Sequence, residues 1–160
     1  MSAKRINSSM QLTRAADYAL RVMIHLAGRP ERERALLPQL AEMTGAPESF
    51  LSKVLQALTR AHLVASRRGK SGGFVILPRG RQASVSDVVE AIDGPIRLNI
   101  CLTTGRSCVR KAICPVHPVW VQAQQAMMDV LCAARIADLA ARSASEEQEP
   151  CAPLALAAKH

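Results

Sequence analysis

A helix, a glycine turn, a second helix and a glycine-rich hairpin follow one another between residues 37 and 77, and this order constrains the fold most. Leu37, Leu40 and Ala41 predict a short helix that breaks at Thr44-Gly45-Ala46. Pro47-Glu48 then suits the start of a second helix, where proline is tolerated and a carboxylate meets the positive helix end. The small, glycine and apolar residues at 41, 45 and 51 fit a helix-turn-helix. An ordinary pair of antiparallel helices with a solvated polar face is the alternative.

The second predicted helix has two faces. An apolar stripe is expected to pack on the core, and it consists of Phe50, Leu51, Val54, Leu55 and Leu58. The other stripe is polar and consists of Ser49, Ser52, Lys53 and Gln56. Residues 63–68 and 74–77 then predict two short strands joined by Gly69-Lys70-Ser71-Gly72-Gly73. This hairpin is typical of a winged helix, whose basic wing reaches phosphates while the preceding helix enters the major groove.

Charge is divided unevenly along the chain. Residues 1–81 contain 14 of the 21 Lys and Arg but 5 of the 13 Asp and Glu, a net charge of +9, whereas residues 82–160 carry −1. A basic N-terminal half indicates a polyanionic partner, with general solubility as the alternative explanation. Aromatic residues make up only 2% of the chain. The core must therefore consist of Leu, Val, Ile, Ala and Met, which favours packed helices and a mainly α fold.

Further helices are predicted on both sides of this region. One runs from an N-cap at Thr13 to about residue 27, and another spans Ser84–Asp93 before Gly94-Pro95. A long helix is expected from Val119 to about Arg142, a length of about 36 Å. We expect it to be a dimerisation helix, with packing inside the monomer as the alternative. Its apolar seam alternates by four and three residues, through Val119, Ala123, Ala126, Val130, Ala133, Ala137 and Ala140.

The predicted organisation has four parts. Residues 1–9 are a flexible extension, 10–81 a winged helix-turn-helix DNA-binding domain, 82–142 a helix with a cysteine loop and the dimerisation helix, and 143–160 a disordered tail. The first nine residues are not followed by the apolar core of a signal peptide. No stretch approaches the roughly 18 apolar residues of a membrane span. We therefore expect a cytoplasmic protein without a membrane partner.

Three cysteines and a histidine lie close together in the sequence. Cys101, Cys108 and Cys114 are separated by six and five residues, and two residues separate Cys114 from His117. Thiols and an imidazole suit a metal, and basic neighbours would stabilise the thiolates. The spacings are wider than in most structural zinc sites, which favours an iron–sulfur cluster over zinc; unligated thiols are the other alternative. Cys132 is expected to pack in the long helix, and Cys151 to have no role.

Several motifs combine with these cysteines: Leu12-Thr13-Arg14, Asp17-Tyr18-Ala19-Leu20-Arg21, Phe50-Leu51-Ser52-Lys53-Val54-Leu55-Gln56, Val64, Arg68-Gly69-Lys70-Ser71-Gly72-Gly73 and Trp120. Together they resemble the Rrf2 family of bacterial iron–sulfur repressors over about residues 10–142. The resemblance implies a dimeric winged helix-turn-helix regulator, not an enzyme, whose cluster state sets its affinity for double-stranded promoter DNA.

The resemblance also implies ligands. Cys101, Cys108 and Cys114 match the three thiolates that hold a 2Fe–2S or 4Fe–4S cluster. The fourth ligand is open, because His117 matches the histidine of IscR-like members and Asp17 of the partner subunit matches the aspartate of NsrR-like members. The first cysteine interval is six where those members have five, which leaves the cluster type open. His62 replaces the glycine that the family often has after the recognition helix, a position that favours positive φ.

The sequence thus predicts a homodimeric transcriptional regulator, expected to be a repressor, that senses redox state, nitric oxide or iron. A regulator of the same fold that uses thiols or zinc is one alternative, and an iron–sulfur electron carrier is another. No small organic substrate is expected. DNA contacts are expected from the polar stripe, the wing and the start of the first helix, through Ser49, Ser52, Lys53, Gln56, Arg67, Arg68, Lys70, Ser71 and Arg14.

Overall fold

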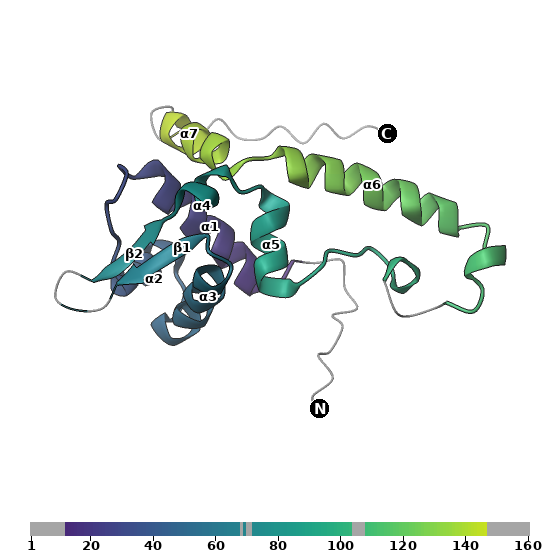
Figure 1. Ribbon diagram of the computed structural model, residues 1–160, viewed down its shortest axis with the longest axis horizontal. Helices are drawn as coiled ribbons and strands as arrows, with labels where there is room; N and C mark the ends of the chain where they lie inside the picture. The colour runs from purple at the N-terminus through teal and green to yellow at the C-terminus, as the bar shows by residue number, and fades with distance from the viewer. Residues whose placement is uncertain (1–11, 68, 70–71, 104–107, 147–160) are drawn as a thin grey trace, which may run out of the picture.

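The computed structural model describes residues 12–67, 69, 72–103 and 108–146, and in them the chain is mainly helical, as expected (Figure 1). One two-stranded antiparallel sheet accompanies the helices. The elements are α1 (Arg14–Gly28), α2 (Leu37–Thr44), α3 (Glu48–Arg60), β1 (Val64–Arg67), β2 (Gly73–Ile76), α4 (Pro78–Gln82), α5 (Val85–Asp93), η1 (Ile100–Leu102), η2 (Lys111–Ile113), α6 (His117–Ala133) and α7 (Ile136–Glu146).

Helices α2 and α3 form the predicted helix-turn-helix. Gly45 ends α2 in the left-handed conformation, with φ of 69°, which an L side chain adopts only at a cost. Of the predicted apolar stripe of α3, Leu51, Val54, Leu55 and Leu58 are buried. Phe50 lies at the margin of that stripe, 37% exposed, where its ring packs edge-on against Tyr18 with centroids 5.8 Å apart.

The predicted hairpin is also present. Strands β1 and β2 pair antiparallel, with Val64 opposite Ile76 and Arg67 opposite Gly73. Ala35 forms an isolated antiparallel bridge with Phe74 on the other side of β2. The Ala35 N–H donates to the Phe74 carbonyl at 3.0 Å, and the Ala35 carbonyl accepts from the Phe74 N–H at 2.9 Å. These contacts complete a winged helix-turn-helix domain with a small sheet.

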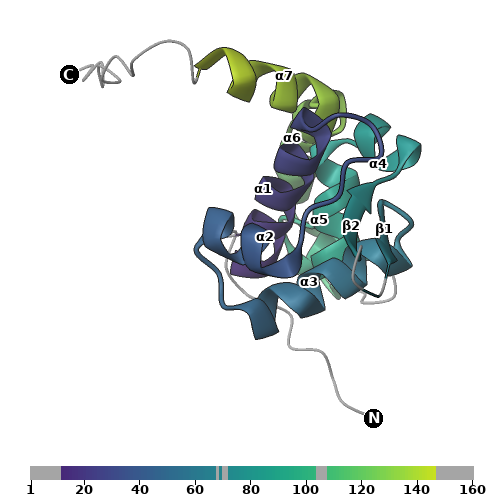
Figure 2. The same cartoon turned by 90° about the vertical axis from the view of Figure 1, so that its left-hand side faces the viewer.

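Helix α1 forms the centre of this domain. Its N-cap is Thr13, as predicted, and the Thr13 hydroxyl accepts a hydrogen bond from the Ala16 N–H at 3.2 Å. Its buried face packs against α3, α5 and α7. Helices α3 and α7 lie at opposite sides of α1 (Figures 1 and 2). The short helix α4, for which the sequence carries no clear signal, continues directly from the sheet.

The prediction of a single long helix from residue 119 to 142 is wrong. Helix α6 ends at Ala133, and α7 begins at Ile136 after a change of direction. The break arises because Ala134 and Arg135 pair with the segment before α5: the Val85 N–H donates to the Ala134 carbonyl at 2.9 Å, and the Ile136 N–H donates to the Ala83 carbonyl at 2.9 Å.

The second half of the expected helix therefore packs on its own domain. Ile136 and Ala140 of α7 are buried against the core. Helix α7 continues to Glu146, so residues 143–146, expected in a disordered tail, are helical. The expected extension 1–9 and the rest of the expected tail, residues 147–160, lie outside the described residues.

Candidate DNA-binding surface and cysteine site

The polar stripe of α3 lies on the outer surface of the domain. Ser49, Lys53 and Gln56 are exposed and Ser52 is half-buried, because the buried leucines and valine of α3 turn its other face to the core. Helix α3 runs along the edge of the molecule opposite α7 (Figure 2). An exposed helix that displays hydroxyl, ammonium and amide groups has the donors and acceptors needed for base edges and phosphates.

The expected wing contacts are only partly described. Arg67, at the end of β1, is exposed, and so is Arg14, the first residue of α1. Arg68, Lys70 and Ser71 lie outside the described residues. The structure thus places Arg67 on the hairpin that follows α3 and Arg14 at the start of α1.

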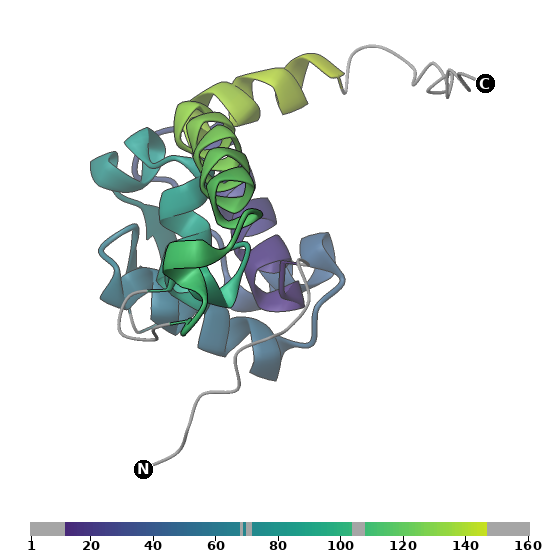
Figure 3. The same cartoon turned by 90° about the vertical axis from the view of Figure 1, so that its right-hand side faces the viewer.

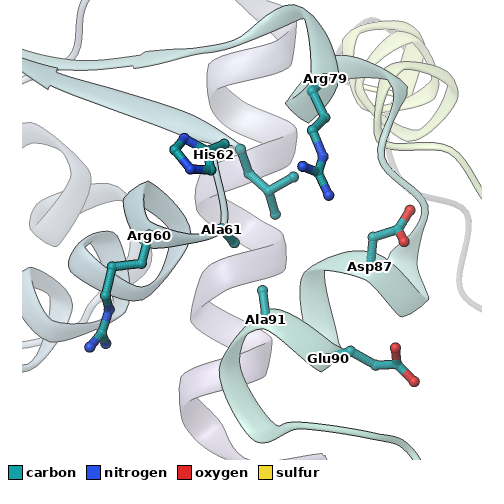
Figure 4. Close-up of a pocket in the computed structure, with 8 residues that line it drawn as sticks. Arg60, Ala61, His62, Arg79, Asp87, Glu90 and Ala91 are labelled. Carbon is teal, nitrogen blue, oxygen red and sulfur yellow. The ribbon is translucent and has the colours of Figure 1, made fainter.

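The turn from α3 into β1 has the conformation expected at His62. His62 adopts φ of 57°, in the left-handed region. Beside this turn lies a surface hollow of about 420 Å³ (Figure 4). Basic side chains line one side of this hollow and acidic side chains of α5 line the other. The lining residues include His62, Arg79, Asp87, Glu90, Ala61 and Ala91. None of the candidate metal ligands lines this hollow, so it is separate from the cysteine site.

Asp87, beside this hollow, forms a capping box with Ser84 at the start of α5. The Ser84 N–H and hydroxyl donate to the Asp87 carboxylate at 2.8 and 2.7 Å, and the Asp87 N–H donates to the Ser84 hydroxyl at 3.2 Å. These hydrogen bonds, the backbone one first, hold the pKa of Asp87 below its usual value, and Arg135 and Arg79 add to the effect. Asp87 is thus part of the framework that holds α5 in place.

The segment from η1 to the start of α6 carries the four candidate ligands, and it lies at the end of the molecule away from the β1–β2 hairpin (Figure 1; Figure 3 views the molecule from this end). Cys101 belongs to η1, Cys108 precedes η2, Cys114 follows η2, and His117 is the first residue of α6. All four side chains are half-buried. Backbone hydrogen bonds fold the segment tightly: the Lys111 N–H donates to the Cys108 carbonyl at 3.0 Å, and the His117 N–H donates to the Cys114 carbonyl at 3.1 Å.

The described residues hold no group of three or more His, Cys, Asp or Glu side chains arranged to bind a metal ion. The structure therefore does not gather the three thiols, and residues 104–107 between Cys101 and Cys108 lie outside the described part of the chain. The imidazole Nδ1 of His117, however, is buried and has no hydrogen-bond partner among the residues that the structure describes. Buried polar atoms rarely lack a partner, and metal ligation is one way to satisfy such a nitrogen. In chemistry, although not in arrangement, thiols and this imidazole fit an iron or zinc site.

The remaining candidates have ordinary partners. The carboxylate of Asp17 pairs with Arg21 on the same helix at 3.0 Å, and both side chains are about half exposed. The Sγ of Cys132 lies 3.1 Å from the Ser86 hydroxyl, and Cys132 is an exposed residue of α6. Cys151 lies outside the described residues.

The sequence did not predict the contacts of two side chains, Gln124 and Thr13, that join separate parts of the fold. Gln124 of α6 bonds the backbone at Ile96 and Leu98. The Thr13 hydroxyl contacts the Asp93 carboxylate at 2.7 Å, which joins the start of α1 to the end of α5. A single glutamine or aspartate on a helix has no sequence signature, so only the fold shows these contacts.

A winged helix with an exposed recognition helix defines a class of DNA-binding regulators. The model of the Rrf2 family, described as iron-dependent transcriptional regulators, matches residues 12–142. The chain is 30% identical over 131 residues to the HTH-type transcriptional regulator NsrR of Geobacillus kaustophilus, with 81% of this chain and 89% of that one covered. The chain therefore belongs to the Rrf2 family of transcriptional regulators, a non-enzymatic role.

Solved structures agree with this assignment. The structure of IscR from T. potens matches with a TM-score of 0.63 and 25% identity, over 89% of this chain and 93% of that one. The structure of CymR, the global cysteine regulator of B. subtilis, matches with a TM-score of 0.65 and 24% identity, over 82% and 97% of the two chains, and supports the fold. Among the described residues, no helix is long and apolar enough to cross a membrane.

Proposed function

We propose that the protein is a cytoplasmic, homodimeric repressor that binds promoter DNA through α3 and the wing, and that an iron–sulfur cluster at Cys101, Cys108 and Cys114 sets its affinity. The observation that carries the cluster assignment is the unpartnered, buried Nδ1 of His117, three residues after Cys114 at the start of α6. The cluster is the means by which redox state, nitric oxide or iron supply would reach the DNA-binding domain.

DNA binding follows from the position of α3. Lys53 and Gln56, with Ser49 and Ser52, would meet base edges and flanking phosphates in the major groove. The exposed Arg67 and Arg14, together with Arg68, Lys70 and Ser71 of the wing, would contact the phosphate backbone or the minor groove. The net charge of +9 on residues 1–81 provides the electrostatic attraction.

Dimer formation is supported by the surface of α6. This helix buries none of its residues within the chain, and Val119 and Val130 of the predicted seam are 57% and 69% exposed. Helix α6 also contacts α5 within the chain, so part of it follows the alternative of packing inside the monomer, as α7 does. Two copies joined along α6 would present two recognition helices to a site with two-fold symmetry.

At the cysteine site, the three thiolates would bind iron, with His117 as the fourth ligand from the same chain or Asp17 of the partner subunit in its place. Nδ1 of His117 is available because no group in the described part of the chain bonds it, whereas the Asp17 carboxylate would first have to leave Arg21. These contacts favour His117 over Asp17. A bound cluster would supply iron that exchanges electrons and reacts with nitric oxide.

A regulator of the same fold that uses zinc or free thiols is the second candidate. It is favoured by the fact that the described residues form no assembled metal-binding group. The electron-carrier alternative is not retained, because the relatives are named transcriptional regulators.

The first experiment measures iron, sulfide and zinc per chain, with the visible spectrum, on protein purified without oxygen. Iron and sulfide in equal amounts with cysteinyl charge-transfer bands support the cluster, whereas zinc or no metal supports the second candidate. Binding of holo and apo protein to a pool of promoter fragments is then compared. Equal affinity of the two forms contradicts regulation by the cluster.

The DNA surface is tested with a matched pair of variants. Lys53→Ala removes a charge from α3, and Arg142→Ala removes one from α7 on the opposite side. If a dimer contacts about six phosphates, log affinity falls with log salt at a slope of about −5. Lys53→Ala should weaken binding and flatten this slope by about one unit for each phosphate no longer neutralised, while Arg142→Ala should leave both unchanged. A salt-independent wild-type affinity contradicts the DNA-binding proposal.

A further inference from the structure

One glutamine of α6 bonds the backbone that leads to the first cysteine. The Oε1 of Gln124 accepts a hydrogen bond from the Leu98 N–H at 2.8 Å, and its Nε2 donates to the Ile96 carbonyl at 2.9 Å. Both contacts are partly buried, and they span 26 and 28 residues of sequence. Because an amide group both donates and accepts, it can satisfy the N–H and the carbonyl of the same extended segment together.

The neighbouring contacts of this segment define where it goes next. The Ile96 N–H donates to the Glu90 carboxylate of α5 at 3.3 Å, and the Asn99 side chain accepts from the Ile100 N–H at 2.7 Å to start η1. Element η1, which contains Cys101, contacts α6. The segment thus runs below α6 toward the end where α6 begins (Figure 1).

The position of Gln124 on α6 matches that of His117. Seven residues separate them, which is two helical turns, so both side chains leave the same face of the helix, about 10 Å apart along its axis. Cys101 is three positions after Leu98, a stretch that spans at most about 10 Å. A segment fixed at Gln124 and directed toward the start of α6 therefore holds η1, which contains Cys101, against the helix that begins at His117.

We propose that Gln124 is a positioning residue for the cysteine site: its two backbone hydrogen bonds set the register of the Cys101 segment against α6. This inference rests on the proposed cluster function. In the described residues the side-chain hydrogen bonds of Gln124 go to the backbone of Ile96 and Leu98, so Gln124 acts on the candidate ligands through the segment 96–98. Because the same segment continues from α5, which packs on α1 and α3, Gln124 also joins the cysteine site to the helix that contacts the DNA-binding domain.

The chain offers a matched control in the next residue. Gln125 lies on the same helix and bonds only the exposed Asp129 side chain at 2.8 Å among the contacts of its side chain in the described residues. Gln124→Ala and Gln125→Ala make the same chemical change and have the same effect on helix propensity. They differ in whether the Cys101 segment remains bonded to α6.

Two readouts are compared in the full chain. In protein without a cluster, Gln124→Ala should speed hydrogen exchange of the amides of residues 96–103 by about 30-fold, which corresponds to the loss of two hydrogen bonds of about 1 kcal/mol each. In reconstituted protein, Gln124→Ala should change the visible circular dichroism of the cluster and speed its loss to a chelator by about 10- to 100-fold, the usual effect of removing a group that orients a metal ligand. Gln125→Ala should match the wild type in both.

Each outcome bears on the inference. Unchanged exchange in residues 100–103 of Gln124→Ala overturns it, because Gln124 then does not hold the Cys101 segment. Faster exchange with an unchanged dichroism spectrum and chelation rate also overturns it, because Gln124 then only orders the chain. A wild-type protein that binds no cluster shows instead that the proposed function has failed, and this is seen without any variant.

Discussion

His62 combines an unfavourable residue type with a well-formed helix end. The Leu63 N–H donates to the Leu58 carbonyl and the His62 N–H to the Thr59 carbonyl, both at 3.0 Å, which is the Schellman pattern. The two apolar residues that accompany this pattern, Leu58 and Leu63, are both buried in the hydrophobic core. This pattern requires a left-handed residue at 62, and histidine adopts that conformation at a cost that glycine does not have.

We expect His62→Gly to stabilise the protein by about 1 kcal/mol, since the strain of a left-handed non-glycine residue is of that order. His62→Val should destabilise it, because β-branched residues tolerate positive φ least. Thermal unfolding measures both changes. Ala61→Gly is the control: Ala61 has φ of −78°, so glycine there should lower the melting temperature. A lower melting temperature for His62→Gly contradicts the presence of strain at this position.

The lowered pKa of Asp87 predicts how the stability of the protein depends on pH. Hydrogen bonds from Ser84 lower the pKa of Asp87, so its ionised form stabilises the folded state above the usual carboxyl pKa, and this contribution is lost as pH falls through the lowered value. We expect Asp87→Asn to reduce stability at pH 7 by about 1 kcal/mol, as for other helix caps. The difference from wild type should shrink below about pH 4. Unfolding in urea across pH measures it, with the exposed Asp129→Asn as control.

At the scale of elements, the position of α4 depends on the close approach of Gly80 to the backbone of Leu63. A Cβ on Gly80 would overlap the carbonyl oxygen of Leu63, so α4 can pack against the start of the sheet only with glycine here. Gly80→Ala should therefore cost about 1–3 kcal/mol, the usual cost of overpacking. Gly28→Ala, at the end of α1, places its Cβ in open space and should be neutral or slightly stabilising. Equal unfolding midpoints for the two variants would contradict this packing.

The elements that the sequence predicted well are those with local signals. Gly45, Pro47 and the glycine-rich hairpin act within a few residues of themselves, and the structure confirms the helix-turn-helix and the strand pair they indicate. The break between α6 and α7 has no such signal, because no glycine or proline stands at Ala134 or Arg135. Their backbone pairs with Ala83 and Val85, about fifty residues earlier, and apolar periodicity does not report a contact of that kind.

For the candidate site, the sequence likewise predicted the residues but not how they are arranged. Residue type and spacing identify a candidate ligand set, because closely spaced Cys and His residues can be recognised in the sequence itself. This set consists of Cys101, Cys108, Cys114 and His117. Their arrangement depends on how the segment after α5 lies on α6, and thus on the two hydrogen bonds of Gln124. Those bonds join parts of the chain that only the tertiary fold brings together.

At the scale of the whole molecule, α6 is the feature that a single chain leaves unexplained. It extends from the domain with exposed valines along a seam of small residues, whereas a monomer has little reason to expose them together (Figure 1). A second copy packed along this seam would bury these side chains and place two recognition helices in one particle. Small alanine side chains at positions 123, 126 and 133 would allow the two helices to approach closely.

We therefore expect Val130→Glu to weaken dimerisation at least tenfold, because a carboxylate at the seam would be buried without a partner. Gln125→Glu adds the same charge off the seam and should leave the dimer intact. Sedimentation equilibrium measures both, and circular dichroism checks that the helices persist, as expected for a residue that is 69% exposed in one chain. The monomeric variant should also bind DNA more weakly, since each chain then contacts one half-site alone. A Val130→Glu protein that remains fully dimeric at the wild-type dissociation constant would place the dimer interface elsewhere on the molecule.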